Sequence, residues 1–259
     1  MGVLLVASLC LLLIGNVPNA PSVSIDLLGV AWNHDNLTVR ITVQDGLDLS
    51  YWNEAATALH DWSNVLKSRS GNSSSFNFIL IDNENRAINV SDITITIAIT
   101  MGKDAPVGLT ALGATEVVTE VVMVERVVVS ESIGQVNIHM AAAHFETSFL
   151  TGKTTFTKLV REGIRNIARH ELGHAIGLGH TNSTNIRSDL MAPRFVDVDY
   201  DVFPSNLDIE AVLHIYGQDG FGGSNLSQIP SSYSLRDPIN DIKIGILTWN
   251  ILVCTRSKF

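Results

Sequence analysis

The residues with the clearest chemical potential form the stretch HELGHAIGLGH at 170–180. On a helix, His170 and His174 lie on one face and about 6 Å apart along the axis. Two imidazoles placed in this way can both reach one Zn²⁺ at roughly 2.0–2.1 Å. Glu171 follows the first histidine and is not needed as a ligand, so it can accept a proton from a water on the metal.

The same stretch contains a third candidate ligand. Gly177 allows the helix to end in a left-handed turn, which redirects the chain and lets His180 approach the metal. Three neutral imidazoles leave a fourth position open for water, which is the arrangement of a catalytic rather than a structural zinc. A helix with two surface histidines would explain the first five residues equally well. The added glycine and histidine at these offsets favour the zinc site.

These residues require a scaffold of helices and strands, and hydrophobic periodicity predicts one. Apolar residues recur at helical spacing in 51–67, with Ser50 as N-cap, and in 154–176. Ser205 and Asp208 predict the start of a last helix, and Gly217 its end. Strands are expected at 37–43, 76–81, 93–99, 135–140 and within 109–129, the last as two strands broken near Glu120. Interleaved strands and helices predict an α/β or α+β layer fold.

Composition limits the function further. The chain has 259 residues, enough for one substantial domain, with 17 Lys+Arg against 26 Asp+Glu and a net charge of −9. This balance argues against a nucleic-acid partner, because phosphate contacts need clustered basic residues. The two cysteines, Cys10 and Cys254, exclude a disulfide-stapled scaffold. No apolar run reaches the roughly 18–20 residues of a membrane-spanning helix.

The first twenty residues have the pattern of a secretory signal peptide. Residues 3–14 are almost uninterrupted apolar sequence, and cleavage is expected near Ala20. A buried strand or an uncleaved anchor are the alternatives. We therefore expect a secreted or extracellular protein, or one held at the cell surface. Five N-x-S/T sequons, which are also common by chance, are compatible with this: Asn36, Asn72, Asn89, Asn182 and Asn225.

The eleven-residue stretch resembles the zinc signature of the metzincin metallopeptidases. Met191, in the sequence SDLMAP at 188–193, is similar to the methionine of the Met-containing turn that lies beneath the zinc in that clan. The closest resemblance is to the matrixins, because Thr181 follows the third histidine. The sequence from Leu190 to Phe195 is also similar to the matrixin turn and substrate-pocket wall, with Phe195 where tyrosine is usual. Residues 208–217 resemble the last matrixin helix.

The resemblance implies a single peptidase domain at 22–217. Its fold would be α/β (α+β), with a twisted mixed β-sheet, three helices and a zinc cleft above the Met-turn. It implies a zinc-dependent endopeptidase acting on protein or peptide substrates, with His170, His174 and His180 as metal ligands and Glu171 as the catalytic base. Pro193 and Phe195 would line the substrate pocket. Asp208 would support the site or pair with the mature amino terminus, although stabilising its own helix explains it equally well.

Several matrixin features are not recognisable. The segment from His180 to Met191 is longer than usual, and Cys10 is the one cysteine upstream of the motif, so the cysteine-switch propeptide is not found. The Asp- and His-rich calcium and structural-zinc segment is also missing, so the sequence supports one catalytic zinc, and no recognisable motif supports calcium. His139 and His144 are candidates for a second metal, but we favour ordinary polar side chains.

Three questions stay open at this stage. The protein could be a zinc-binding, catalytically inactive module that binds a peptide or a partner protein, although Glu171 argues against it. It could also be a thermolysin-like peptidase with a distant glutamate ligand, although His180 and Met191 argue against that. Residues 112–118 are either an interior strand or an edge strand that binds extended peptides. Residues 218–236 are expected to be a linker. The apolar stretch 242–254 after it could be a strand pair, a membrane-touching tail or the start of a further domain.

Overall fold

The computed structural model describes eleven segments of the chain: 23–70, 75–81, 90–99, 111–124, 127–147, 150–185, 187–195, 199–217, 221, 229–234 and 251–256. The expected signal peptide lies outside these segments, as do the sequons at Asn72, Asn89 and Asn225. Among the described residues, no helix is both long enough and apolar enough to cross a membrane.

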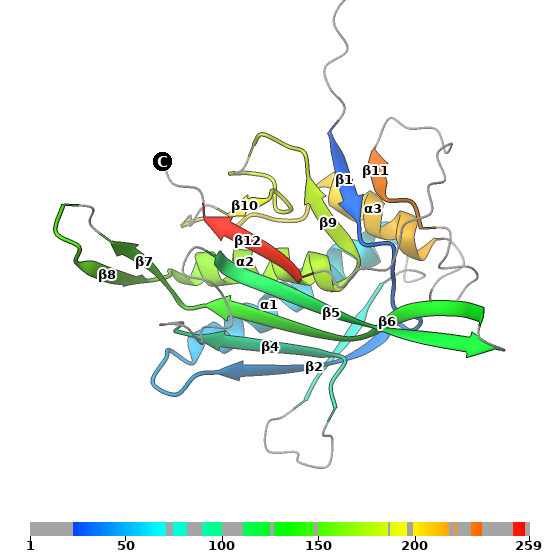
Figure 1. Ribbon diagram of the computed structural model, residues 1–259, viewed down its shortest axis with the longest axis horizontal. Helices are drawn as coiled ribbons and strands as arrows, with labels where there is room; N and C mark the ends of the chain where they lie inside the picture. The colour runs from blue at the N-terminus through cyan, green and yellow to red at the C-terminus, as the bar shows by residue number, and fades with distance from the viewer. Residues whose placement is uncertain are drawn as a thin grey trace, which may run out of the picture.

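A mixed sheet of seven strands forms the centre of the molecule (Figure 1). Its strands are, in spatial order, β10 (Arg194–Phe195), β12 (Ile251–Arg256), β5 (Ala111–Val124), β6 (Val127–Ala141), β4 (Ile93–Ala98), β2 (Asn36–Val43) and β3 (Asn77–Leu80). The pairs from β6 to β3 are parallel, whereas β5 runs antiparallel to both β6 and β12. The central strands alternate buried branched residues with less buried ones, as in the ITITIA sequence of β4.

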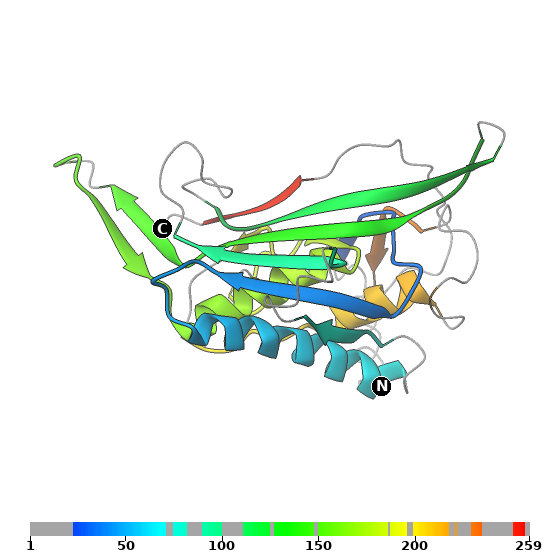
Figure 2. The same cartoon turned by 90° about the horizontal axis from the view of Figure 1, so that it is seen from below.

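Two helices cover one face of this sheet (Figure 2). They are α1 (Ser50–Ser70) and α2 (Arg161–Ala175). Leu59, Trp62 and Leu66 of α1 are at most 1% exposed and belong to one core with the sheet and α2. From Ile167 to Ala175 every residue of α2 is buried, including three that are ionisable in the predicted motif. Because charged and polar side chains are rarely buried without partners, these residues must be paired within the core or available to a ligand.

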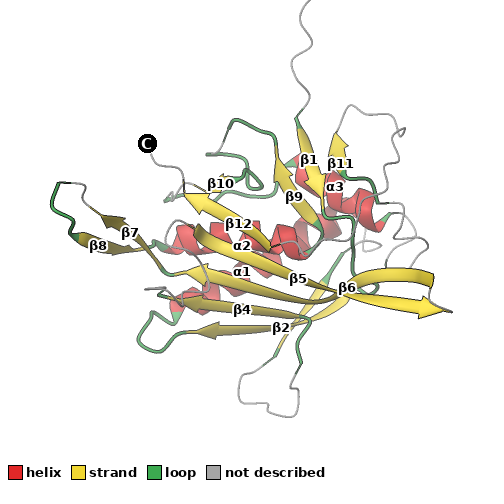
Figure 3. Ribbon diagram, in the orientation of Figure 1, coloured by secondary structure: helices red, strands yellow, loops and turns green. Residues whose placement is uncertain are grey.

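Smaller elements surround this core (Figure 3). A second sheet has the order β11 (Ser232–Ser234), β1 (Ser24–Leu27) and β9 (Leu178–Thr181), all antiparallel. β7 (Ala143–Thr147) and β8 (Thr154–Lys158) form a hairpin that projects from one end of the molecule. The last helix, α3 (Asn206–Tyr216), begins with the predicted capping box between Ser205 and Asp208 and ends at Gly217.

The predicted fold class is confirmed: three helices and a twisted mixed sheet form an α/β arrangement. The expected start of the motif helix at Thr154 was wrong, because the β-branched residues of 154–158 pair with β7 and α2 begins only at Arg161. The expected break near Glu120 was also wrong: β5 continues to Val124, and 135–140 is part of the long partner strand β6.

The remaining differences concern the start of α1 and the segments near the end of the sequence. The start of α1 is capped by Asp48, whose carboxylate accepts the backbone N–H of Ser50, so Ser50 is not the capping residue. The segment 218–236 was expected to be a linker, yet its residues 232–234 form β11 and extend the small sheet. The apolar tail contributes β12 to the main sheet.

Candidate active site

The histidines of α2 face one another in the core. His170 and His174 are at most 1% exposed, and their Nε2 atoms lie 3.1 Å apart. Each ring is held by a backbone carbonyl through its other nitrogen: His170 Nδ1 is 2.5 Å from Leu190 O, and His174 Nδ1 is 2.8 Å from Leu178 O. Because a carbonyl can only accept a hydrogen bond, both Nδ1 atoms carry the proton and both Nε2 atoms present lone pairs.

The third histidine comes from the strand after α2. Gly177 has φ 103°, a conformation that residues with a Cβ rarely adopt, and it turns the chain out of the helix into β9. Gly179 then allows β9 to lie against β1, since an added Cβ there would be 2.7 Å from Asp26 Cβ. This places the ring of His180 4.8 Å from that of His174 and 5.4 Å from that of His170, centroid to centroid.

The three rings form the one candidate metal-binding group found within the described segments, with their ligand atoms all within 4.8 Å of one another. Two observations show that the donor set fits a cation. The facing lone pairs of His170 and His174 have no proton between them, and the buried Nε2 of His180 has no hydrogen-bond partner in the described structure. Burial lowers the pKa of all three histidines, to about 3 for His170, so the rings are in the neutral form that binds zinc.

Glu171 is fully buried beside this cluster. One carboxylate oxygen, Oε2, accepts a hydrogen bond of 2.6 Å from Thr115 Oγ1 of β5. The other, Oε1, has no partner among the residues described. Burial raises the pKa of Glu171 to about 8, and the hydrogen bond from Thr115 opposes this rise. With one oxygen free beside the histidines, this carboxyl group is placed to accept and return a proton.

A turn around Met191 supports the histidines from below. Gly173 of α2 touches the buried Met191 so closely that an added Cβ would lie 2.5 Å from its Sδ. Asp189 holds the turn with both oxygens: Oδ1 accepts the N–H of Met191 (3.1 Å), and Oδ2 accepts the hydroxyl of Thr181 (2.9 Å). The same turn carries the carbonyl of Leu190 that accepts from His170 Nδ1, so its position determines the orientation of that ring.

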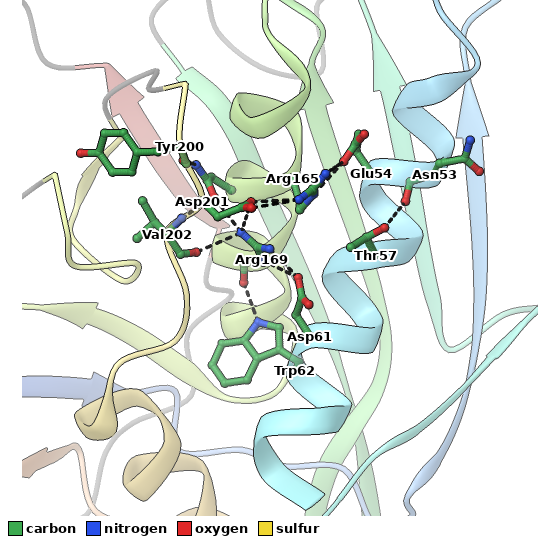
Figure 4. Close-up of polar contacts among 11 residues, drawn as sticks. Asn53, Glu54, Thr57, Asp61, Trp62, Arg165, Arg169, Tyr200, Asp201 and Val202 are labelled. Atoms are coloured by element: carbon green, nitrogen blue, oxygen red, sulfur yellow. Dashed lines mark hydrogen bonds and ion pairs between the residues drawn. The ribbon is translucent and has the colours of Figure 1, made fainter. Parts of the chain in front are cut away.

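A network of ion pairs and hydrogen bonds joins α2 to α1 and to the segment around Asp201 (Figure 4). Arg169 is 1% exposed and forms ion pairs with Asp61 of α1 (2.5 Å) and with Asp201 (2.9 Å). Arg165, one turn earlier, pairs with the same Asp201 and with Glu54 of α1. Because Arg169 directly precedes the first histidine, the network connects α1 and the 199–203 segment to the helix that carries the site.

The structure does not bring the other described residues predicted from the sequence into the histidine cluster. Pro193 is exposed and Phe195 lies in β10, two and four residues beyond Met191. His139 is part-buried in β6 and joins no group of three metal-ligating side chains within the described segments; the side chain of His144 lies outside them. His60 and His214 are exposed, whereas Trp62 is in the core as expected. Asp208 caps α3 through Oδ2, and burial raises its pKa to about 7.

Sequence reasoning missed Thr115, Gly113 and Asp189. An added Cβ at Gly113 would overlap the carboxyl of Glu171 and lie 2.7 Å from its Cδ. No local sequence pattern identifies Thr115 and Gly113 as neighbours of Glu171, because this contact forms only when the distant strand β5 packs on α2. Asp189, two residues before the methionine, has the spacing of a side chain that bonds a nearby backbone N–H, and this was the available signal.

The comparisons with known proteins agree with this geometry. The family model of the matrixins matches residues 31–217, which is most of the chain. The chain therefore belongs to the matrixin family of zinc metallopeptidases, within the metzincins. A search of curated proteins finds no match. The family uses zinc and acts on peptide or protein substrates, and the three-histidine cluster is suited to such a metal.

Proposed function

We propose that the protein is a secreted zinc endopeptidase in which His170, His174 and His180 hold one zinc ion and Glu171 is the general base. The observation that carries the proposal is the buried cluster itself. Two Nε2 lone pairs face each other at 3.1 Å, a third buried Nε2 has no partner in the described structure, and a carboxylate oxygen is free beside them. A structural zinc site would have no use for Glu171.

His170, His174 and His180 would hold the zinc, which would supply a Lewis acid for the scissile carbonyl and for water. The protein provides proton transfer and orientation. Glu171, fixed by Thr115 through Oε2, has Oε1 free to accept a proton from the attacking water and to return it to the leaving amine. The carbonyls of Leu190 and Leu178 keep His170 and His174 in the tautomer that presents Nε2.

The substrate preference follows from the turn. We propose that Met191, Pro193 and Phe195 border an apolar pocket just beyond the scissile bond, so bulky apolar residues such as leucine are preferred on the leaving-group side. A cleavage profile dominated by charged residues at that position would contradict this assignment.

Secretion is proposed from the apolar segment 3–14 and is supported by the exposure of two sequon asparagines, Asn36 and Asn182. The mature amino terminus should be found near residue 21 by terminal sequencing of protein from the culture medium. Recovery of intact Met1 in soluble cytosolic protein would contradict the proposal.

The direct test is a metal count combined with a peptide-library cleavage assay on purified 21–259. We expect one zinc per chain, cleavage within the library, loss of cleavage on chelation and its return with added zinc. The matched control is the same preparation kept metal-free. Protein that holds zinc but cleaves no peptide would instead favour the zinc-binding module without peptidase activity.

A further inference from the structure

The strand of the main sheet that contacts Glu171 is β5. Thr115 donates to Oε2 of Glu171, and Gly113 lies against the same carboxyl group. A peptide bond that is to be cleaved must bring its carbonyl close to Glu171 and the histidines. An extended peptide could do this by pairing with the side of β5 that faces away from β6, where main-chain hydrogen bonds would hold it.

That side of β5 is occupied by the end of the chain itself. β12 pairs antiparallel with β5 over five residue pairs, from Ile251 opposite Glu116 to Thr255 opposite Ala111. In the middle of this register, Leu252 lies opposite Thr115 and Cys254 opposite Gly113, the two β5 residues that contact Glu171. The sequence ILVCTR has the branched and apolar residues typical of a strand.

The other side of β12 is paired as well. Its last residues run parallel to β10, with Thr255 opposite Arg194 and Arg256 opposite Phe195. β10 follows Met191 closely in the chain, so β12 lies between β5 and the segment after the Met191 turn (Figure 1). An extended peptide lying along β5 in the place of β12 would meet the same two neighbouring strands.

We propose that residues 251–256 act as an intramolecular competitor that occupies the substrate strand position along β5. The inference rests on the proposed peptidase function and adds its regulation. A tethered segment meets its site at an effective concentration in the millimolar range, so a free peptide must compete with it. Strand pairing supplies the competition, and the tail raises the apparent KM while leaving kcat nearly unchanged.

The test uses the full-length chain with Leu252→Pro and Val253→Pro together. Successive backbone N–H groups in a strand point to opposite edges, so one of the two prolines necessarily removes a hydrogen bond aimed at β5. A second variant ends at Asn250 and lacks β12. The matched control ends at Arg256 and keeps it.

With zinc-loaded protein and a short peptide substrate, we expect both variants without a functional β12 to lower KM by roughly tenfold or more. The control ending at Arg256 should behave like the full chain. A synthetic peptide of residues 249–258 should restore competitive inhibition to the proline variant, and a scrambled peptide should not. Cys254→Ser should leave KM close to that of the full chain, because the competition comes from the backbone.

A second readout does not depend on activity. In metal-free protein, backbone amides of β5 between Ala111 and Glu116 should exchange hydrogen faster in the proline variant than in the full chain. Equal KM values in active full-length and variant proteins, or equal exchange rates, would overturn the inference. Activation by Cys254→Ser equal to that of the prolines would overturn it in favour of the thiol. If every zinc-loaded form is inactive, the proposed function fails, and the exchange rates still decide the pairing.

Discussion

Replacing Gly113 by alanine should impair catalysis without impairing the fold. The added Cβ would overlap Oε1 of Glu171 and lie 2.7 Å from Cδ and 2.8 Å from Cγ. Ordinary contacts begin near 3.5 Å, so the carboxyl group has to move by about 1 Å. Gly113 is not among the glycines with positive φ, so alanine fits the backbone of β5 without strain.

The size of the effect follows from this displacement. A misplacement of about 1 Å in a reacting group can cost roughly 10²-fold in rate, or about 2.7 kcal/mol in the activation barrier. We therefore expect kcat/KM for peptide hydrolysis to fall roughly hundredfold in Gly113→Ala. Zinc content should stay at one per chain, and the melting temperature should shift by only a few degrees, because a buried side chain moves while the core is retained.

The chain offers a matched control in the neighbouring strand. At Gly134 of β6 an added Cβ would meet another glutamate, lying 2.8 Å from Cδ and 2.9 Å from Oε1 of Glu120. Glu120 is exposed and can swing into water, so Gly134→Ala should retain nearly full activity. Full activity in Gly113→Ala, an equal loss in both variants, or a loss explained by missing zinc would refute the reasoning.

Three further predictions concern what holds the site. In Gly173→Ala the new Cβ would lie 2.5 Å from Met191 Sδ, and such overpacking costs about 1–3 kcal/mol against a helix-propensity gain of about 1 kcal/mol. Chemical denaturation should therefore show equal or lower stability than the wild type, and zinc binding should be weaker. A clear gain in stability would contradict the packing of Gly173 on Met191. The double variant Asp61→Asn/Asp201→Asn leaves the charge of the buried Arg169 uncompensated and should lower the free energy of unfolding by about 3–5 kcal/mol. Arg169→Met should cost less, because the two aspartates that it leaves unpaired are partly exposed. The reverse order in urea unfolding would show that these ion pairs do not hold α2 in place. In metal-free protein, burial raises the pKa of Glu171 to about 8, so the folded state binds a proton that the unfolded state has lost, and stability falls as pH rises from about 4.5 to 8. Glu171→Gln should therefore be more stable than the wild type at pH 8 and nearly equally stable at pH 4. A difference in stability that stays constant across that range would contradict the raised pKa.

The sequence was most informative where the chemistry is local. The spacing of His170 and His174 on a helix, the turn at Gly177 and the capping box of α3 all depend on residues within a few positions of one another. Such features are decided by backbone geometry, which a short stretch of sequence determines well. Hydrophobic periodicity also predicted α1, α2 and the strands from β2 to β6, but not the shorter strands around them. The start of α2 was misplaced because Phe156, in the strand β8, continues the apolar spacing of the helix.

What the sequence did not reveal depends on contacts between distant segments. The hydroxyl of Thr115 reaches Glu171 across 56 positions of the chain. The pairing of β12 with β5 joins residues more than a hundred positions apart. The sequence did not decide whether 112–118 is an edge or an interior strand, because the strand that pairs with its outer side, β12, lies far away in the chain. Nothing in the sequence of an apolar stretch such as 242–254 indicates which strand it pairs with.

The central claim is that Glu171 transfers protons while the three histidines hold the metal, and one comparison of two variants tests it most directly. Zinc content and peptide hydrolysis should be measured together for Glu171→Gln and His180→Ala. Glu171→Gln should keep one zinc and lose at least roughly 10²–10⁴-fold in hydrolysis, whereas His180→Ala should bind zinc more weakly. Loss of zinc in Glu171→Gln, or hydrolysis unchanged by it, would contradict this division of roles.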